Sequence, residues 1–339
     1  MKHLILPLAA ALLAAPLSAA EPAPAKAPIP SEIVAAAPQG DWVAIAAADL
    51  LVMELAPDAR GKPRRVVIQL MPAPFSQGWV GNLRKLAAAH WWDGLSVYRV
   101  QDNYVAQWGD ADGEVAGKGR KLPDGLAKVP ESEYVAPYAD LTNPIYVPIP
   151  GETTPPATSF ARPRGPFVKV RHLSFHSGQD SYESFVGHAL PGWPVAYNGA
   201  TVWPIHCYGM VGVARDLSPD TGTGAELYAV IGHAPRQLDR NIALVGRVIE
   251  GIEHLSSLPR GPGNGVYADP GDRTPIRSVR PGNEVAGLPA YEYLSTESGS
   301  FARYAEARAN RRDPFFIMPA GGADICNIPV PVRRSAGSR

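Results

Sequence analysis

The pattern of apolar and polar residues in the first third of the chain predicts short strands around one helix. Leu50–Leu55 and Arg65–Met71 are β-rich runs separated by a turn-forming stretch, which is the pattern of a hairpin. From Pro74 to Ala89 apolar residues recur every three or four positions, as they do on one face of an amphipathic helix. Alternation typical of strands then returns over Trp92–Val100 and Tyr104–Trp108.

The second half of the chain adds more short elements of the same kind. Similar runs predict one short helix, Glu250–Leu258, and four strands: Met210–Ala214, Glu226–Ile231, Ala243–Val248 and Thr274–Val279. This order favours a mostly β fold, a closed antiparallel barrel capped by two helices, over a layered parallel sheet. The 36 prolines and 33 glycines agree with this fold, because both residue types interrupt long helices.

Two regions do not fit the strand pattern. Residues 117–203 are rich in prolines, glycines and isolated aromatic residues, and we expect an irregular insertion there with one strand at Phe167–Phe175. Residues 281–339 form a C-terminal extension with one predicted helix, Ser298–Arg312, and an apolar end interrupted by prolines. The barrel domain itself is expected over residues 41–280.

The first residues have the pattern of a secretory signal peptide. Lys2 precedes an apolar run over residues 4–17, and small residues follow up to Ala20, where we expect cleavage. The run contains two prolines and is shorter than the roughly 20 apolar residues of a membrane-spanning helix. Residues 21–40 read as a linker rich in proline and alanine. The sequence therefore predicts a periplasmic or secreted protein that is not inserted in a membrane after cleavage.

Charge and the cysteine and histidine residues indicate which partners, cross-links and metal sites to expect. The 32 basic and 32 acidic side chains balance, so nothing indicates a nucleic-acid partner. An even number of cysteines in an exported chain favours a disulfide between Cys207 and Cys326, and two buried thiols are the alternative. His172 lies in the predicted strand and His176 directly follows it, and no third ligand is suitably spaced, so no metal site is predicted. His206 is interpreted as structural.

Two sequence blocks carry a family resemblance. The first runs from Trp92-Asp93-Gly94 through Arg99 to Gln107, Gly109 and Asp110. The second is Gly209–Arg215, followed by Glu226, Leu238-Asp239 and Val245–Gly251. Together they resemble the signature of cyclophilins, which are peptidyl-prolyl cis-trans isomerases with a β-barrel fold. The match covers about 50–115 and 207–280, so residues 117–203 would lie outside the barrel as one elaboration between two core strands.

The resemblance implies roles for particular residues. Arg99 would be the catalytic residue, and Gln107 would orient the substrate carbonyl. An apolar cup for the proline ring would be formed by Tyr104, Val105, Tyr228, Leu238 and Ile242. Ala214, Arg215 and Glu226 would also lie on the substrate-binding face. The alternatives are that Arg99 is a solvated arginine at a strand end and that the apolar residues belong to the barrel core.

Some residues depart from the family pattern. Glu226 takes the place of a glutamine, Gln237 that of a tryptophan and Ile242 that of a histidine. The last two changes alter the expected rim of the substrate site. A carboxylate at Glu226 could fix the Arg99 guanidinium by a bidentate pair or neutralise the field used in catalysis, and the sequence leaves both open.

The sequence leads to one functional hypothesis and one alternative. The first is an isomerase, without cofactor, that assists the folding of exported proteins by acting on proline-containing polypeptides. Its arginine would favour the twisted amide over either planar isomer. The alternative is a non-catalytic module that holds proline-containing segments of envelope proteins.

Overall fold

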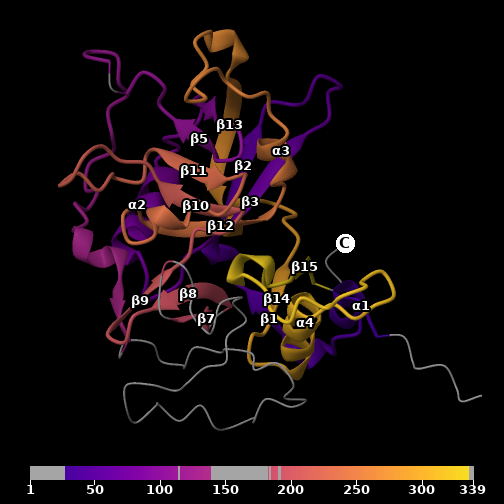
Figure 1. Ribbon diagram of the computed structural model, residues 1–339. Coiled ribbons are helices and arrows are strands. Elements are labelled where there is room, and N and C mark those ends of the chain that lie inside the picture. Colours follow the sequence, from indigo (N-terminus) through magenta and orange to yellow (C-terminus); the bar gives the residue numbers. More distant parts are fainter. Residues whose placement is uncertain (1–26, 114, 139–181, 183–184, 190–191, 336–339) are drawn as a thin grey trace, which may run out of the picture.

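The computed structural model describes residues 27–113, 115–138, 182, 185–189 and 192–335. Eight strands form a closed barrel in which every neighbouring pair is antiparallel (Figure 1). In barrel order they are β10 (Met210–Val213), β11 (Leu227–Val230), β5 (Val105–Gly109), β4 (Ser96–Val100), β13 (Thr274–Pro281), β2 (Leu50–Leu55), β3 (Arg64–Leu70) and β12 (Leu244–Glu250). The predicted fold class is therefore confirmed.

Alternation along the strands fills the barrel interior. Ala106 and Trp108 of β5, and Leu227 and Ala229 of β11, belong to the main buried core. Successive side chains of a strand point to opposite faces, so the residues between them face outward. In β5 and β11 the main core is thus built from one face, and the other face is free to carry chemistry.

Two helices accompany the barrel. The first, α2 (Gln77–Ala88), buries Trp79, Leu83 and Leu86, three of the apolar residues that recur every three or four positions in the sequence. The indole Nε1 of Trp79 donates to the Gly222 carbonyl at 2.9 Å. The helix begins three residues later than predicted because Ser76 has a left-handed backbone conformation (φ 53°) that a helix cannot include. The second helix, α3 (Glu253–Ser256), lies within the predicted range.

The predicted insertion contributes a small second sheet. Its strand order is β6 (Ala136–Pro137), β9 (Thr201–Pro204), β8 (Trp193–Tyr197) and β7 (Phe185–Ala189). Trp193 and Trp203 are almost fully buried in the same core as the barrel residues. The predicted strand at 167–175 with His172, and His176 directly after it, lie outside the described residues. The described part of the insertion thus adds to the barrel core rather than forming a core of its own.

A buried arginine joins this sheet to the barrel. Arg247 of β12 donates from Nη1 to the Gly192 carbonyl at 2.8 Å, and its guanidinium carbon lies 4.5 Å from the centre of the Trp193 ring. Burial lowers the pKa of Arg247 to about 10. Its Nε also donates to Gln69 Oε1 at 2.9 Å. One side chain therefore links two barrel strands and the insertion.

The fold begins earlier than the sequence suggested. Residues 21–40 were expected to be a linker, but α1 (Pro30–Ala35) is helical and buries Ile33. Ile33 packs in one cluster with Trp42, which starts β1 (Trp42–Ile45), and with Phe301 of the C-terminal helix α4 (Gly299–Ala309). Only packing against the distant tail makes this short helix stable, and the local sequence carries no sign of that tail.

The C-terminal extension forms a third sheet with the N-terminal segment. β14 (Tyr291–Leu294) lies between β1 and β15 (Val332–Arg334), antiparallel to both. Helix α4 lies within the predicted 298–312, and Ser298 caps it by accepting from the Phe301 amide at 3.0 Å. None of the helices in the described part of the chain has both the length and the apolar composition needed to cross a bilayer.

A disulfide between Cys207 and Cys326 joins the tail to the segment before β10. The two Cα atoms lie 5.1 Å apart, and 119 positions separate the cysteines in the sequence. Closing so long a loop reduces the conformational freedom of the unfolded chain. The bridge therefore holds the third sheet and α4 against the barrel.

We expect Cys326→Ser to lower the free energy of unfolding by about 2–5 kcal/mol, because the unfolded chain regains the freedom that the bridge removes. Denaturant unfolding without reductant measures the change. In the double variant Cys207→Ser/Cys326→Ser, reductant should have no further effect. Thiol titration of the denatured, unreduced wild type that finds two free thiols would contradict the bridge.

Candidate active site

A β-bulge in β4 sets the direction of the side chains at the candidate site. Val97 is paired with Trp108 and Arg99 with Gln107, so Tyr98 is one residue more than β5 can match. Val97 and Val100 both lie in the main core. In a regular strand Arg99 would point the same way as Val97, but the extra residue turns both Tyr98 and Arg99 outward.

The guanidinium of Arg99 is held from three directions. Its Nε donates to the Asn264 carbonyl at 2.8 Å, Nη1 donates to Gln107 Oε1 at 3.0 Å, and Nη2 donates to Gln101 Oε1. The guanidinium carbon lies 5.9 Å from the centre of the Tyr104 ring. These bonds use one N–H on each nitrogen, so Nη1 and Nη2 each keep a second N–H for another acceptor.

A chain of hydrogen bonds runs from Arg99 to a carboxylate. Gln107 accepts from Arg99 and donates from Nε2 to the Tyr98 hydroxyl. Tyr98 in turn donates to Glu226 Oε2 at 2.9 Å, and Glu226 Oε1 accepts from the Asp110 amide at 2.7 Å. Burial, and then the Glu226 charge, raise the pKa of Tyr98 well above its ordinary value, so Tyr98 stays a donor. Bonds aligned in one direction polarise one another.

A set of apolar side chains, which we call the outer apolar cluster, occupies the outer face of β5 and β11. Its members are Tyr104, Val105, Ala214, Tyr228, Val230, Leu238 and Ile242. Val105, Tyr228 and Val230 are buried, and the others are half-buried. This cluster is separate from the main core. The structure thus brings together all five residues predicted to form an apolar cup, and they are not barrel core.

Val230 is the member that sequence reasoning missed. It stands two positions after Tyr228 in β11, so strand alternation alone would have placed it on the same face. Gly212 of β10 is paired with Tyr228, and a Cβ at Gly212 would lie 2.3 Å from the ring carbon Cζ of Tyr228. The aromatic ring therefore lies directly over a position where only glycine leaves room for it.

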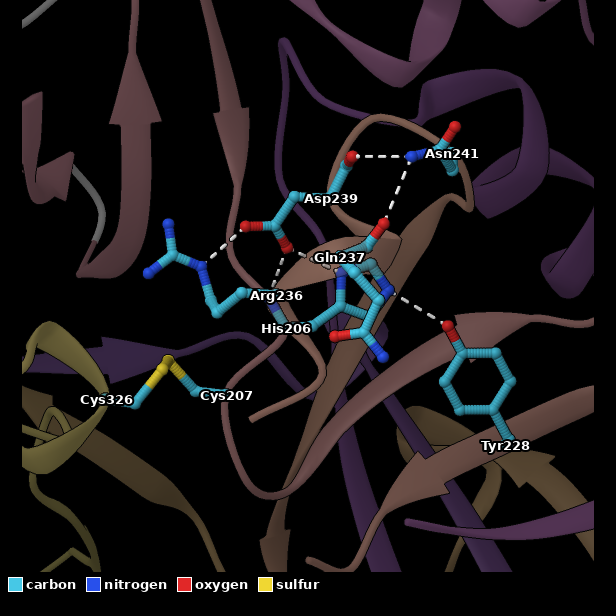
Figure 2. A network of polar contacts seen from close by, with 8 residues as sticks. All are labelled: His206, Cys207, Tyr228, Arg236, Gln237, Asp239, Asn241 and Cys326. Atoms are coloured by element: carbon cyan, nitrogen blue, oxygen red, sulfur yellow. Dashed lines mark hydrogen bonds and ion pairs between the residues drawn. A yellow bond between two sulfur atoms is a disulfide. The ribbon is translucent and has the colours of Figure 1, made fainter. Parts of the chain in front are cut away.

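A buried polar network lies behind Tyr228 (Figure 2). The Nε2 atom of His206 lies 2.9 Å from the Tyr228 hydroxyl, and its Nδ1 lies 2.8 Å from Asp239 Oδ1. Asp239 Oδ2 accepts from Arg236 Nε at 2.6 Å. His206 is buried, which agrees with the structural role that the sequence suggested. The sequence did not predict its hydrogen bond with Tyr228, because the two residues are far apart in the chain.

Comparisons with known proteins identify the family of this chain. The family described as cyclophilin type peptidyl-prolyl cis-trans isomerase/CLD matches residues 63–280. The chain belongs to this family. No curated protein shows a significant match to the chain in a sequence search.

One solved cyclophilin structure agrees with this fold. Cyclophilin AquaCyp293 from Hirschia baltica is similar with a TM-score of 0.57 and 19% sequence identity, over 87% of this chain and 94% of that one. A Cryptosporidium parvum cyclophilin-type isomerase, solved in the presence of the dipeptide Ala-Pro, covers 68% of this chain and 97% of its own, with a TM-score of 0.34 and 11% identity.

The remaining predicted site residues of this cyclophilin lie at the edge of the outer apolar cluster. Arg215 follows Ala214 and donates from Nε and Nη2 to the Asn241 carbonyl at 3.0 and 2.9 Å. Gln237, where the family has tryptophan, is exposed on the turn η5 (Arg236–Leu238). Among the described residues, no group of three or more His, Cys, Asp or Glu side chains could hold a metal ion.

We expect Glu226→Gln to lower the pKa of Tyr98, because the substitution removes the carboxylate charge, while burial still keeps this pKa above its ordinary value. At neutral pH the NMR shift of the Tyr98 ring carbon Cζ, in protein with ring-labelled tyrosine, reports how strongly the hydroxyl is hydrogen-bonded, and Tyr98→Phe assigns the signal. Identical Tyr98 shifts in the wild type and the variant would show that the carboxylate does not act on this hydroxyl.

Proposed function

We propose that this cyclophilin is an active peptidyl-prolyl cis-trans isomerase in which Arg99 stabilises the twisted amide. Rotation of an X-Pro bond must cross a barrier of about 18–20 kcal/mol that arises from amide resonance. When resonance is lost, the prolyl nitrogen becomes pyramidal and regains a lone pair. A fixed N–H donor directed at that nitrogen binds the transition state more tightly than either planar isomer.

The observation that carries the proposal is the fixed guanidinium beside the outer apolar cluster. Arg99 is anchored by Asn264, Gln101 and Gln107, and its guanidinium lies near Tyr104, a member of that cluster. A proline ring packed on the cluster would therefore place its nitrogen near the second N–H of Nη1 or Nη2. Donors that are already oriented need no reorganisation during the reaction.

Gln107 and Glu226 support this role indirectly. The Arg99 guanidinium donates to Gln107, and the hydrogen-bond chain continues through Tyr98 to Glu226. The negative charge of Glu226 thus stabilises the Tyr98 end of this hydrogen-bond chain and keeps Gln107 oriented. Of the two effects open from the sequence, ordering of the arginine side chain is the one this connection favours.

A binding module without catalysis is the second candidate. Three of the Arg99 N–H groups are already engaged by the protein, and Gln237 and Ile242 change the expected rim. Such a site would still pack a proline ring on the outer apolar cluster. It would bind proline-containing segments of envelope proteins without accelerating their isomerisation.

We expect Arg99→Ala to lower the isomerisation rate by about 10²–10³-fold, because one oriented donor to the transition state is lost. Arg99→Lys should restore little activity, since a flexible ammonium cannot reproduce the planar fork. A protease-coupled assay on a short X-Pro peptide measures the rates. Circular dichroism should show both variants folded, because each lost hydrogen bond costs only about 1 kcal/mol.

Arg84→Ala is the matched control for this experiment. Arg84 is an exposed arginine of α2 whose Nη2 lies 2.8 Å from Asp49 Oδ1, away from the residues of the candidate site. Its removal should leave the rate unchanged. A folded Arg99→Ala variant with the wild-type rate would remove Arg99 from the mechanism, and an inactive wild type would favour the binding module.

We further propose that the protein acts on exported polypeptides outside the cytoplasm. The signal-like segment that ends at Ala20 supports this location, as does the Cys207–Cys326 disulfide, because disulfides persist in oxidising compartments. In a Gram-negative host, mass spectrometry of the periplasmic fraction should find a mature chain that begins at Glu21. A chain that stays in the cytoplasm with residues 1–20 intact would contradict the proposal.

A further inference from the structure

His206 connects two walls of the outer apolar cluster through the protein interior. One wall is Tyr228 of β11, whose hydroxyl lies 2.9 Å from His206 Nε2. The other wall is Leu238, at the end of the turn η5, and the next residue is Asp239, whose Oδ1 lies 2.8 Å from His206 Nδ1. Figure 2 shows His206 between Asp239 and Tyr228.

The network fixes the tautomer of His206. A carboxylate only accepts hydrogen bonds, so Nδ1 carries the hydrogen and donates it to Asp239. In the neutral imidazole Nε2 is then an acceptor, and the Tyr228 hydroxyl is the donor. Burial raises the pKa of Tyr228 well above its ordinary value, which keeps this hydroxyl protonated. With a neutral imidazole, each of the three groups has a partner for its hydrogen or lone pair.

The network is also held rigidly at its outer ends. Asp239 accepts twice more, from the His206 backbone amide at 3.0 Å and from Arg236 Nε at 2.6 Å. The residue after His206 is Cys207, which is bonded to Cys326. The side chains of His206, Arg236 and Asp239 are at most 5% exposed. Buried networks whose members are all satisfied hold a defined geometry.

We propose that His206 is a positioning residue of the isomerase site. Through Asp239 and the Tyr228 hydroxyl it keeps Leu238 and Tyr228 at a fixed separation, so that the outer apolar cluster is preformed for a proline ring. The inference rests on the proposed function for its substrate. It assigns to His206 no contact with that substrate.

The test is a double-mutant cycle of His206→Gln and Tyr228→Phe in the mature full-length protein. Each single substitution should raise KM for a short Ala-Pro peptide about 2- to 10-fold, with kcat nearly unchanged, because packing on the ring serves substrate and transition state alike. In the Tyr228→Phe background the link between the walls is already cut. His206→Gln should then add less than about twofold, since Arg236 and the backbone amide still hold Asp239.

Two buried residues away from the outer apolar cluster provide matched controls: Tyr304 of α4 and His188 of β7. Tyr304 donates its hydroxyl to the Pro329 carbonyl at 2.8 Å, and His188 Nε2 lies 3.1 Å from the Ile328 carbonyl. Tyr304→Phe and His188→Gln remove the same kinds of group elsewhere in the protein. They should lower the melting temperature and leave KM unchanged.

The possible results separate this inference from the proposed function. KM effects that add across the cycle, or a loss of stability without a change in KM, would overturn the positioning role while the isomerase stands. A wild type that binds the peptide without turnover would overturn the isomerase, and the same cycle would then be measured in Kd by NMR titration. A wild type that neither binds nor turns over the peptide would overturn both.

Discussion

The β-bulge at Tyr98 is the constraint on which the candidate site depends. Strand alternation would direct Arg99 into the barrel after Val97, and an unpaired guanidinium in that core would be strongly destabilising. The extra residue keeps Val97 and Val100 inside and turns Tyr98 and Arg99 outward against Gln107. A single irregularity in one strand pair thus protects the core and creates the polar part of the site.

The barrel supports two separate apolar assemblies. The main core is formed by the inward faces of the strands, and it extends to α2 and the sheet β6–β9–β8–β7. The outer apolar cluster is formed by the opposite face of β5 and β11, where Tyr228 stands between inward-facing Leu227 and Ala229 and Val105 precedes inward-facing Ala106. Because the two sets share strands, a rigid core gives the outer cluster a rigid base.

The segments outside the family pattern stabilise this base from the side. α1 and β1 pack with β14, β15 and α4 (Figure 1). Arg247 connects β12 to the insertion. The Cys207–Cys326 disulfide brings the tail to the residue next to His206. The N-terminal segment and the tail therefore form one structural unit. The disulfide attaches this unit next to His206, in the polar network behind Tyr228.

The sequence by itself determined the barrel, the helix with Trp79, Leu83 and Leu86, and the residues of the outer apolar cluster except Val230. The order of the barrel strands and the helix follow from periodicity, a local property of the chain, whereas the cluster residues were implied by the resemblance of two sequence blocks to cyclophilins. Tertiary structure decided what depends on distant partners: the helix α1, which α4 stabilises, the link from His206 to Asp239 and Tyr228, and the chain from Arg99 to Glu226. Hydrogen bonds between residues far apart in sequence leave no periodic signal, so only the folded chain reveals which polar groups meet.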